Sequence, residues 1–179
     1  MEYKSFETER LIIRPTAQED ADFLFELMNT PKWLQFIGDR NITSLEKAKE
    51  YIKVKMTPQL VRLGYSSYTV ITKEGGVKVG NCGLYDREGL EGIDIGFAFL
   101  PAHEKKGYAY EASNRIKEAA FEDFGIETIC AITAKGNVSS QRLLEKLGLR
   151  QHGTTVLPNE TEELLLFKID RKPEGGKQT

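Results

Sequence analysis

Hydrophobic and polar positions along this 179-residue chain follow two different periods. In short segments apolar residues alternate with polar ones, as on half-buried strands, and in longer segments they recur every three to four residues, as on one face of a helix. Strands are predicted at Leu11–Ile13, Ser67–Thr72, Val77–Leu84, Gly92–Leu100, Thr128–Thr133, Leu149–Thr155 and Leu164–Ile169. Helices are predicted at about Gln18–Met28, Thr43–Met56 and Ser139–Leu147, and from Tyr108 to a C-cap at Gly125. The second helix is expected to start at Thr43, because Thr43 and Glu46 have the spacing of a capping box.

The order of these elements indicates one α+β domain with a mixed, mostly antiparallel sheet of about seven strands. Three strands between Ser67 and Leu100 follow one another without a helix, and the pair Gly75–Gly76 suits a tight hairpin between the first two. The strand, helix and strand that come next argue for one right-handed crossover. We expect the domain to span residues 1–170 and the polar, glycine-containing tail at residues 171–179 to be disordered.

Composition and charge argue against several classes of protein. The net charge is −2 and basic residues are interspersed with acidic ones, whereas nucleic-acid binding needs a clustered basic excess. No apolar run approaches the roughly 18 residues that span a bilayer. Residues 1–14 lack the layout of a signal peptide, so a cytoplasmic location without membrane attachment is expected. Two isolated cysteines and two histidines make neither a disulfide framework nor a metal site.

Large apolar side chains gather in the segment Pro31–Ile42, where a loop is expected. Trp33 and Phe36 either tuck beneath this loop as a satellite of the core or line the wall of a ligand pocket. Both interpretations remain open on the sequence alone. On the second, Trp33 is a candidate substrate-binding residue, and so is Tyr68 on the strand that follows.

The segment of residues 100–112 carries the clearest chemical signal in the chain. It joins a strand to a helix whose first turn contains Gly107 and Ala109. A helix N-terminus offers unpaired N–H groups and the positive end of the helix dipole, and small residues let a phosphate approach that backbone closely. Lys105 and Lys106 add positive charge beside it. The segment is therefore a candidate anion site, although a plain strand-to-helix turn with solvated lysines fits the same spacing.

This segment resembles the acetyl-CoA signature of the Gcn5-related N-acetyltransferase (GNAT) superfamily, Gln/Arg-x-x-Gly-x-Gly/Ala. Its counterpart here runs from Glu104 to Ala109, with Glu104 where the family has Gln, Arg or Trp, and Lys105 where glycine is frequent. The run Asn137–Leu149 is similar to the family's second motif, Asn-x-x-Ala/Ser-x-x-Leu-x-x-Lys-x-Gly-Phe. The opening Glu9–Pro15 and the strand Ile93–Phe99 resemble the branch that includes the ribosomal-protein N-terminal acetyltransferases. Four motifs thus follow in order over residues 7–169.

The resemblance implies a single GNAT-like domain, with helices on both faces of the sheet and a central strand pair that splays apart. Acetyl-CoA would be the acetyl donor, lying in the wedge between those strands, and no metal would take part. The backbone of Ala98 and Phe99 would contact the pantetheine arm, and Asn137 and Ser140 would lie near the pantetheine and the thiol. The pyrophosphate would be held by Lys105, Lys106, Gly107, Tyr108 and Ala109.

The reaction implied by the resemblance is a direct attack of a neutral amine on the thioester carbonyl. An amine with a pKa of about 10 is mostly protonated at neutral pH, so a base or a chain of waters must remove a proton. Asp94 is the first candidate for the base, with Glu91 and Tyr68 as the next candidates. Asp94 is equally a candidate for binding the substrate or for pairing with a surface lysine. Ser140 is the candidate donor to the departing thiolate, because Leu144 occupies the position where many members carry Tyr. Ser140 could instead be only a small residue that lets the cofactor pass.

Two functional classes remain open at this point. The first is an enzyme that acetylates a primary amine, either a protein N-terminus or a small molecule such as an amino sugar, a polyamine or an antibiotic. The second is a catalytically weak acyl-CoA-binding module that acts as a sensor or partner protein, because the family's Tyr is missing and the phosphate loop is irregular. The sequence is compatible with a monomer and with a homodimer.

Overall fold

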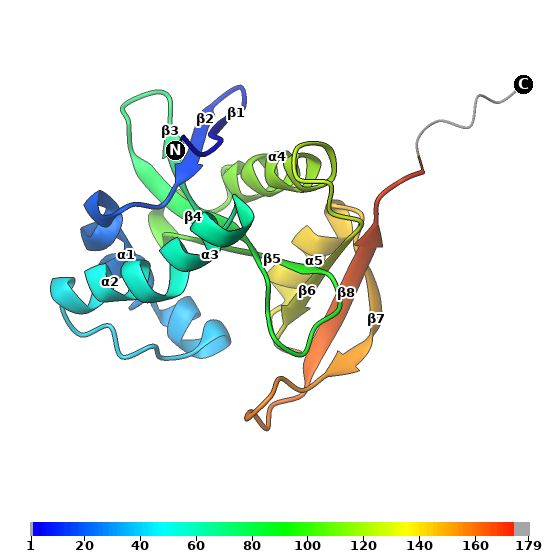
Figure 1. Ribbon diagram of the computed structural model, residues 1–179. Coiled ribbons are helices and arrows are strands. Elements are labelled where there is room, and N and C mark those ends of the chain that lie inside the picture. The colour runs from blue at the N-terminus through cyan, green and yellow to red at the C-terminus, as the bar shows by residue number, and fades with distance from the viewer. Residues whose placement is uncertain (1, 174–179) are drawn as a thin grey trace, which may run out of the picture.

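A mixed sheet of eight strands forms the centre of the computed structural model, which describes residues 2–173 (Figure 1). The strands are β1 (Phe6–Glu7), β2 (Leu11–Pro15), β3 (Ser67–Thr72), β4 (Lys78–Tyr85), β5 (Ile93–Phe99), β6 (Thr128–Thr133), β7 (Arg150–Thr155) and β8 (Leu164–Asp170). They lie in the order β1-β2-β3-β4-β5-β6-β8-β7, and each neighbouring pair is antiparallel except β5 and β6. The predicted α+β fold is confirmed, with one strand more than expected, because the two residues of β1 are too few to show an alternation.

Within residues 2–173, five helices connect the strands, together with four short helical turns. The helices are α1 (Ala21–Leu27), α2 (Leu45–Tyr51), α3 (Thr57–Leu63), α4 (Tyr108–Glu122) and α5 (Val138–Lys146), and the turns are η1 (Gln18–Asp20), η2 (Trp33–Ile37), η3 (Ile52–Met56) and η4 (Pro101–His103). The capping box predicted at Thr43 is wrong. The N-cap of α2 is Ser44, whose hydroxyl accepts a hydrogen bond from the Lys47 N–H at 3.2 Å. The helical path then continues through η3 and α3, beyond the predicted end at Met56.

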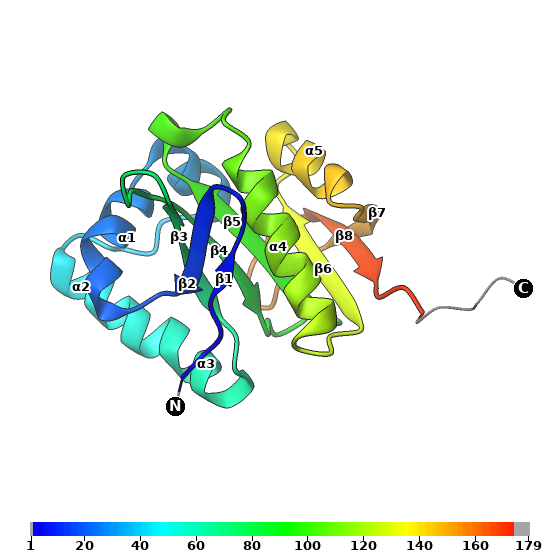
Figure 2. The same cartoon turned by 90° about the horizontal axis from the view of Figure 1, so that it is seen from above.

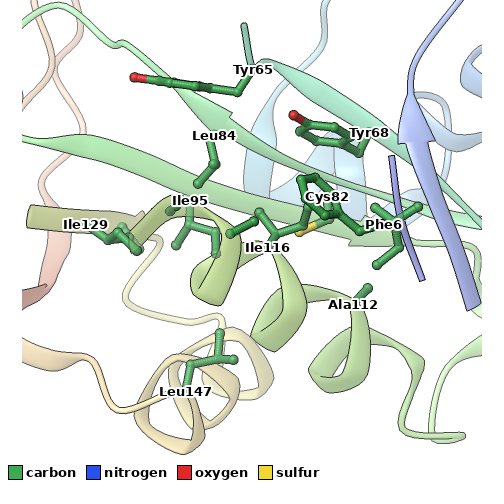
Figure 3. Packing of buried hydrophobic residues seen from close by; sticks show 14 of the residues in the cluster. Phe6, Tyr65, Tyr68, Cys82, Leu84, Ile95, Ala112, Ile116, Ile129 and Leu147 are labelled. Atoms are coloured by element: carbon green, nitrogen blue, oxygen red, sulfur yellow. The ribbon is translucent and has the colours of Figure 1, made fainter. Parts of the chain in front are cut away.

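The helices pack on both faces of the sheet and enclose two separate apolar clusters (Figure 2). One cluster lies between the sheet and α4 and α5, and Figure 3 shows Ala112 and Ile116 of α4 within it. The other lies on the opposite face and is built mainly from α1, α2 and η3. Strand β5 contributes to both, because alternate side chains point to opposite faces of a strand. Ile95 belongs to the first cluster, and Ala98 packs against the second.

The two central strands separate soon after they begin. β5 and β6 run parallel, but their pairing is confined to Ile93 with Ile129 and Asp94 with Cys130. From Ile95 onward β5 keeps its partner β4 and has no partner on the β6 side. The strands therefore form the predicted wedge, with Asp94 at its narrow end and the starts of α4 and α5 beyond its wide end.

Two expectations about the chain as a whole can be compared with the structure. No helix within residues 2–173 is long and apolar enough to cross a membrane. Of the tail predicted to be disordered, residues 171–173 belong to no helix or strand. Residues 174–179 lie outside the described part of the chain.

Candidate active site

The free edge of β5 offers backbone groups to the wedge. In an antiparallel ladder the N–H and C=O groups of successive residues point alternately toward and away from the partner strand. The Leu100 N–H bonds to the Val79 carbonyl at 3.0 Å, on the β4 side. The register between β4 and β5 is unbroken, so the same alternation turns the backbone of Ala98 toward β4, and that of Phe97 and Phe99 toward the wedge. Of the two residues predicted to contact pantetheine, Phe99 thus has the suitable orientation, with Phe97 rather than Ala98 as its companion.

The loop that joins β5 to α4 is curved by two left-handed residues. Lys105 has φ 61° and Gly107 has φ 81°. This explains why glycine is frequent in the family at the position of Lys105, since other residues adopt this conformation at a cost of about 1 kcal/mol or more. Lys105, Lys106 and Gly107 are exposed to solvent, and Tyr108 and Ala109 begin α4 with the unpaired N–H groups of its first turn. The predicted anion site is therefore sterically open and carries positive charge.

Glu104, the departure from the family signature, is paired with a lysine from a distant segment. Its carboxylate lies 2.9 Å from Nζ of Lys32, a residue of the segment that connects α1 to η2. A carboxylate near phosphate groups is unfavourable unless its charge is compensated. Lys32 supplies that compensation and links the loop to the segment that begins with Trp33.

Arg10 contacts this loop from another part of the chain, and the sequence did not predict it as a site residue. It lies in the turn between β1 and β2, and its Nη1 donates to the Lys106 carbonyl at 2.8 Å. Its Nε donates to Glu111 Oε1 at 2.7 Å, and its guanidinium lies 4.6 Å from the centre of the Tyr108 ring. Burial opposes ionisation of Glu111, but hydrogen bonds from Thr8 and Arg10 outweigh it and lower the pKa of that carboxyl. The motif Glu9–Pro15 was the available signal, although the sequence assigned no role to Arg10.

A second helix N-terminus lies across the wedge. Asn137 caps α5, and its side chain accepts a hydrogen bond from the Ser140 N–H at 3.3 Å. The Ser140 side chain makes no hydrogen bond within residues 2–173, so its hydroxyl is available as a donor. Leu144 is buried in the core against the sheet. The position of the family's Tyr is therefore part of the core in this chain.

Asp94 occupies the narrow end of the wedge and is almost fully buried. Its side chain is 4% exposed, and Oδ2 accepts a hydrogen bond from Arg87 Nε at 3.0 Å. Oδ1 has no hydrogen-bond partner among the described residues. Burial raises the pKa of the Asp94 carboxyl to about 6, and the Arg87 guanidinium limits the rise. A carboxyl group with this pKa can exchange a proton near neutral pH.

Tyr85 lies beside Asp94 on the neighbouring strand and was also missed from the sequence. The two residues are paired across β4 and β5, and the Tyr85 hydroxyl donates to Asn81 Oδ1 at 3.3 Å. The aromatic ring lies across Gly83 and Gly96, because a Cβ atom at these positions would come within 2.4 Å and 3.1 Å of it. A polar wall thus extends from Asp94 along β4. Only the register between β4 and β5 shows that Tyr85 lies beside Asp94. The sequence does not determine that register, because seven residues connect the two strands.

The two predicted substrate-binding aromatic residues have different surroundings. Trp33 in η2 packs against the same cluster as Ala98, and its Nε1 is buried without a hydrogen-bond partner among the described residues. Phe36, one turn later, packs against a different cluster, which contains Ala134 just beyond β6. Tyr68 is fully buried on the opposite face of the sheet from Asp94, next to Phe6 (Figure 3). The structure therefore places Trp33 against a cluster that Ala98 also contacts, and it leaves Tyr68 in the core, because the register pairs Tyr68 with Cys82 on the α4 side.

Comparison with known proteins identifies the class of this fold and site. The family model described as the acetyltransferase (GNAT) domain matches residues 10–150. The chain belongs to this family, and it is an acetyl-CoA-dependent acetyltransferase. Helices on both faces of a sheet with a parallel, splayed central pair are the architecture that the resemblance implied.

Individual relatives agree with this assignment. The uncharacterized N-acetyltransferase YnaD of Bacillus subtilis is 27% identical over 146 residues, which is 82% of each chain. A ribosomal-protein-S5-alanine acetyltransferase from Vibrio fischeri superposes with a TM-score of 0.76 at 19% identity, covering 95% of this chain and 100% of its own. RimL, a ribosomal L7/L12 α-N-protein acetyltransferase solved with coenzyme A, gives 0.79 at 14% identity, covering 93% and 98%. At these identities the structural likenesses establish the fold.

Proposed function

We propose that the protein transfers the acetyl group of acetyl-CoA directly to a primary amine, on a protein N-terminus or on a small molecule. The Asp94 carboxyl group carries this proposal. It is buried at the narrow end of the wedge, one of its oxygens has no hydrogen-bond partner in the described part of the chain, and its pKa is raised to about 6. A buried carboxylate with a free oxygen is suited to accept a proton from a protonated amine or from a water bound to it.

The other roles follow from the groups around the wedge. Acetyl-CoA supplies a thioester as the acetyl donor. Phe97 and Phe99 present backbone N–H groups that would stabilise negative charge developing on the acetyl oxygen. As the carbon–nitrogen bond forms and the carbon–sulfur bond breaks, the amine proton goes to Asp94, and the Ser140 hydroxyl donates a hydrogen bond to the departing thiolate. The loop from Lys105 to Ala109 would hold the pyrophosphate through its backbone.

The proposal also concerns which class of amine accepts the acetyl group. Two structural neighbours carry the names of ribosomal-protein acetyltransferases, which supports protein N-termini as one class to test. The alternative, a catalytically weak acyl-CoA-binding module, is favoured by the buried Leu144 in place of the family's Tyr. Turnover distinguishes the two, since the module would bind acetyl-CoA and release no thiol in the presence of amines.

Calorimetry of acetyl-CoA binding tests the donor site first. Gly107→Glu places a carboxylate at the start of α4, and Gly107→Gln introduces the same backbone strain and nearly the same volume without the charge. We expect the Glu variant to bind acetyl-CoA at least about tenfold more weakly than the Gln variant, because like charges oppose each other at the anion site. Equal affinities of the two variants would contradict the phosphate assignment.

An amine panel then tests the transfer. Peptide N-termini, a polyamine and an amino sugar are each mixed with acetyl-CoA and the wild-type protein, and the free thiol is measured. Thiol release that depends on one class of amine supports the enzyme and names its acceptor. Absence of acetyl-CoA binding by the wild-type protein would overturn the proposal, and binding without release across the panel would favour the acyl-CoA-binding module.

A further inference from the structure

The turn between β1 and β2 reaches the start of α4, although about 100 residues separate them in the sequence. The Thr8 hydroxyl and the Arg10 N–H both donate to Glu111 Oε2, and Arg10 Nε donates to the other carboxylate oxygen. Arg10 Nη1 donates to the Lys106 carbonyl. The turn is thus bonded to Lys106, just before the Gly107 N-cap, and to Glu111, in the first turn of the helix after it. These bonds give the motif Glu9–Pro15 a structural role.

The contact with Lys106 lies at the most strained part of the phosphate loop. Lys106 stands between Lys105 and Gly107, the two residues with left-handed φ. Lys105 is not glycine, so its conformation must be maintained by contacts elsewhere. A charge-assisted bond from Arg10 to the Lys106 carbonyl holds the peptide between them, with that oxygen directed toward the β1–β2 turn and away from an incoming anion.

The contact with Glu111 bears on the charge of the site. Glu111 belongs to the first turn of α4, where a carboxylate is favourable for the helix but would repel a phosphate at the same terminus. Arg10 pairs with it at 2.7 Å and so cancels its charge locally. The guanidinium also extends toward Gly107, since a Cβ atom there would lie 3.2 Å from Arg10 Nη2. One side chain therefore fixes the loop and compensates the acid beside it.

We propose that Arg10 is a positioning residue for the phosphates of acetyl-CoA, acting through the Lys106 carbonyl and the Glu111 carboxylate. This inference rests on the proposed function of the loop, and it makes Arg10 specific for the part of the ligand that carries charge. Loss of the side chain should weaken the binding of acetyl-CoA and leave the binding of pantetheine unchanged. Damage to the fold as a whole would weaken the binding of both.

Calorimetry of acetyl-CoA and NMR titration with pantetheine, which lacks the phosphates, test the assignment. Arg10→Met keeps most of the apolar stem and should weaken acetyl-CoA binding by about tenfold, the lower range for a charge-assisted bond to a partly exposed group. Arg10→Lys keeps the charge but cannot bond to both partners at once, so it should retain the melting temperature and lose about three- to fivefold. Arg115→Met removes another arginine of the same surface pocket, one that stacks on Phe6, and serves as the matched control.

The outcomes separate this inference from the proposed function. If the wild-type protein binds acetyl-CoA and both Arg10 variants bind it equally well, the positioning role is wrong and the donor site stands. Equal losses for acetyl-CoA and pantetheine would also overturn it, as would a loss of the same size in Arg115→Met. A wild-type protein that binds no acetyl-CoA would overturn the proposed function itself.

Discussion

Burial of the ionised Asp94 side chain lowers the stability of the folded protein, and the same burial gives its carboxyl group a pKa suited to a base. Its folded pKa of about 6 exceeds the ordinary value of 3.8, because burial disfavours the charged form. Below about pH 4 the carboxyl is neutral in the folded and unfolded states, and no penalty arises. As pH rises from about 4 to 6, the unfolded chain ionises first, and the stability of the protein falls. Above about pH 6 the penalty is complete, which is also where the carboxylate can act as a base.

Replacement of Asp94 by Asn should therefore separate stability from activity. At pH 8 we expect Asp94→Asn to be more stable than the wild type by about 2–3 kcal/mol, and at about pH 3, below both pKa values, the difference should vanish. The wild-type rate of acetyl transfer should rise with pH through about 6, and the variant should lose this limb together with most of its activity. Chemical denaturation at both pH values and a pH–rate profile measure these effects.

Asp86→Asn is the matched control for this prediction. Asp86 lies one residue beyond β4 and pairs with Arg62, but its side chain is 46% exposed. Its replacement should change stability by no more than about 0.5 kcal/mol at either pH and leave the rate profile intact. A rate profile that keeps its limb near pH 6 in Asp94→Asn would exclude Asp94 as the base and favour a chain of waters.

At the scale of elements, a second buried carboxylate fixes the first helical segment to the sheet. Asp20 lies at the end of η1, directly before α1, and its side chain is fully buried. It accepts hydrogen bonds from Arg14 of β2 and Thr69 of β3, and Lys78 of β4 lies 2.8 Å away. Burial raises the pKa of this carboxyl, but the bonds from Arg14 and Lys78 outweigh it and lower the pKa to about 2. Three strands are thus joined to α1 through one side chain.

We predict that Asp20→Asn destabilises the protein by about 3 kcal/mol at pH 7, because it leaves two cationic groups around a neutral amide. The sign with pH is opposite to that of Asp94. A lowered folded pKa contributes stability above about pH 4, and this contribution is lost as pH falls toward 2. Urea denaturation across this range measures the effect, with the exposed Asp22→Asn as control. A change below about 1 kcal/mol at pH 7 would contradict the role assigned to Asp20.

The elements differ in how far the sequence could predict them. The alternation of side chains along β5 can be followed in the sequence itself, since Ile95 and Asp94 must point opposite ways whatever the rest of the chain does. Local pattern could not predict that Tyr85 lies beside Asp94, nor that Tyr68 faces α4, because both depend on the register between strands. For the same reason Arg10 was found only in the structure, where a turn near the N-terminus meets a helix from the middle of the chain.

At the scale of the whole molecule, the segment around η2 connects parts that the sequence places far apart. Lys32 pairs with Glu104 in the loop before α4, Trp33 packs against the cluster that Ala98 of β5 also contacts, and Phe36 packs against the cluster that contains Ala134. The segment is therefore joined to the loop before α4 by an ion pair and shares apolar clusters with Ala98 of β5 and with Ile132 of β6. Its aromatic side chains pack against apolar clusters, as the first sequence interpretation of this segment expected, and a substrate-binding role of Trp33 stays a prediction.

This arrangement predicts that binding of acetyl-CoA slows hydrogen exchange in the segment around η2. Acetyl-CoA that orders the phosphate loop also orders Glu104, and through the ion pair it orders Lys32 and the turn behind it. Hydrogen exchange of the amides in residues 31–38 should slow by about two- to fivefold on addition of acetyl-CoA, the range that an exposed ion pair of up to about 1 kcal/mol can transmit. Mass spectrometry of peptides from wild type and Lys32→Met measures the difference.

The size of the coupling can be isolated with a matched ion pair elsewhere. Lys4 pairs with Asp123 at 3.1 Å, and these two side chains are 56% and 29% exposed, against 54% and 28% for Lys32 and Glu104. Lys4→Met should therefore preserve the slowing in residues 31–38, whereas Lys32→Met should abolish it without changing the exchange of α4. Slowing of the same size in both variants would mean that the signal passes through the apolar cluster that Trp33 and Ala98 both contact, because that cluster is intact in each of them.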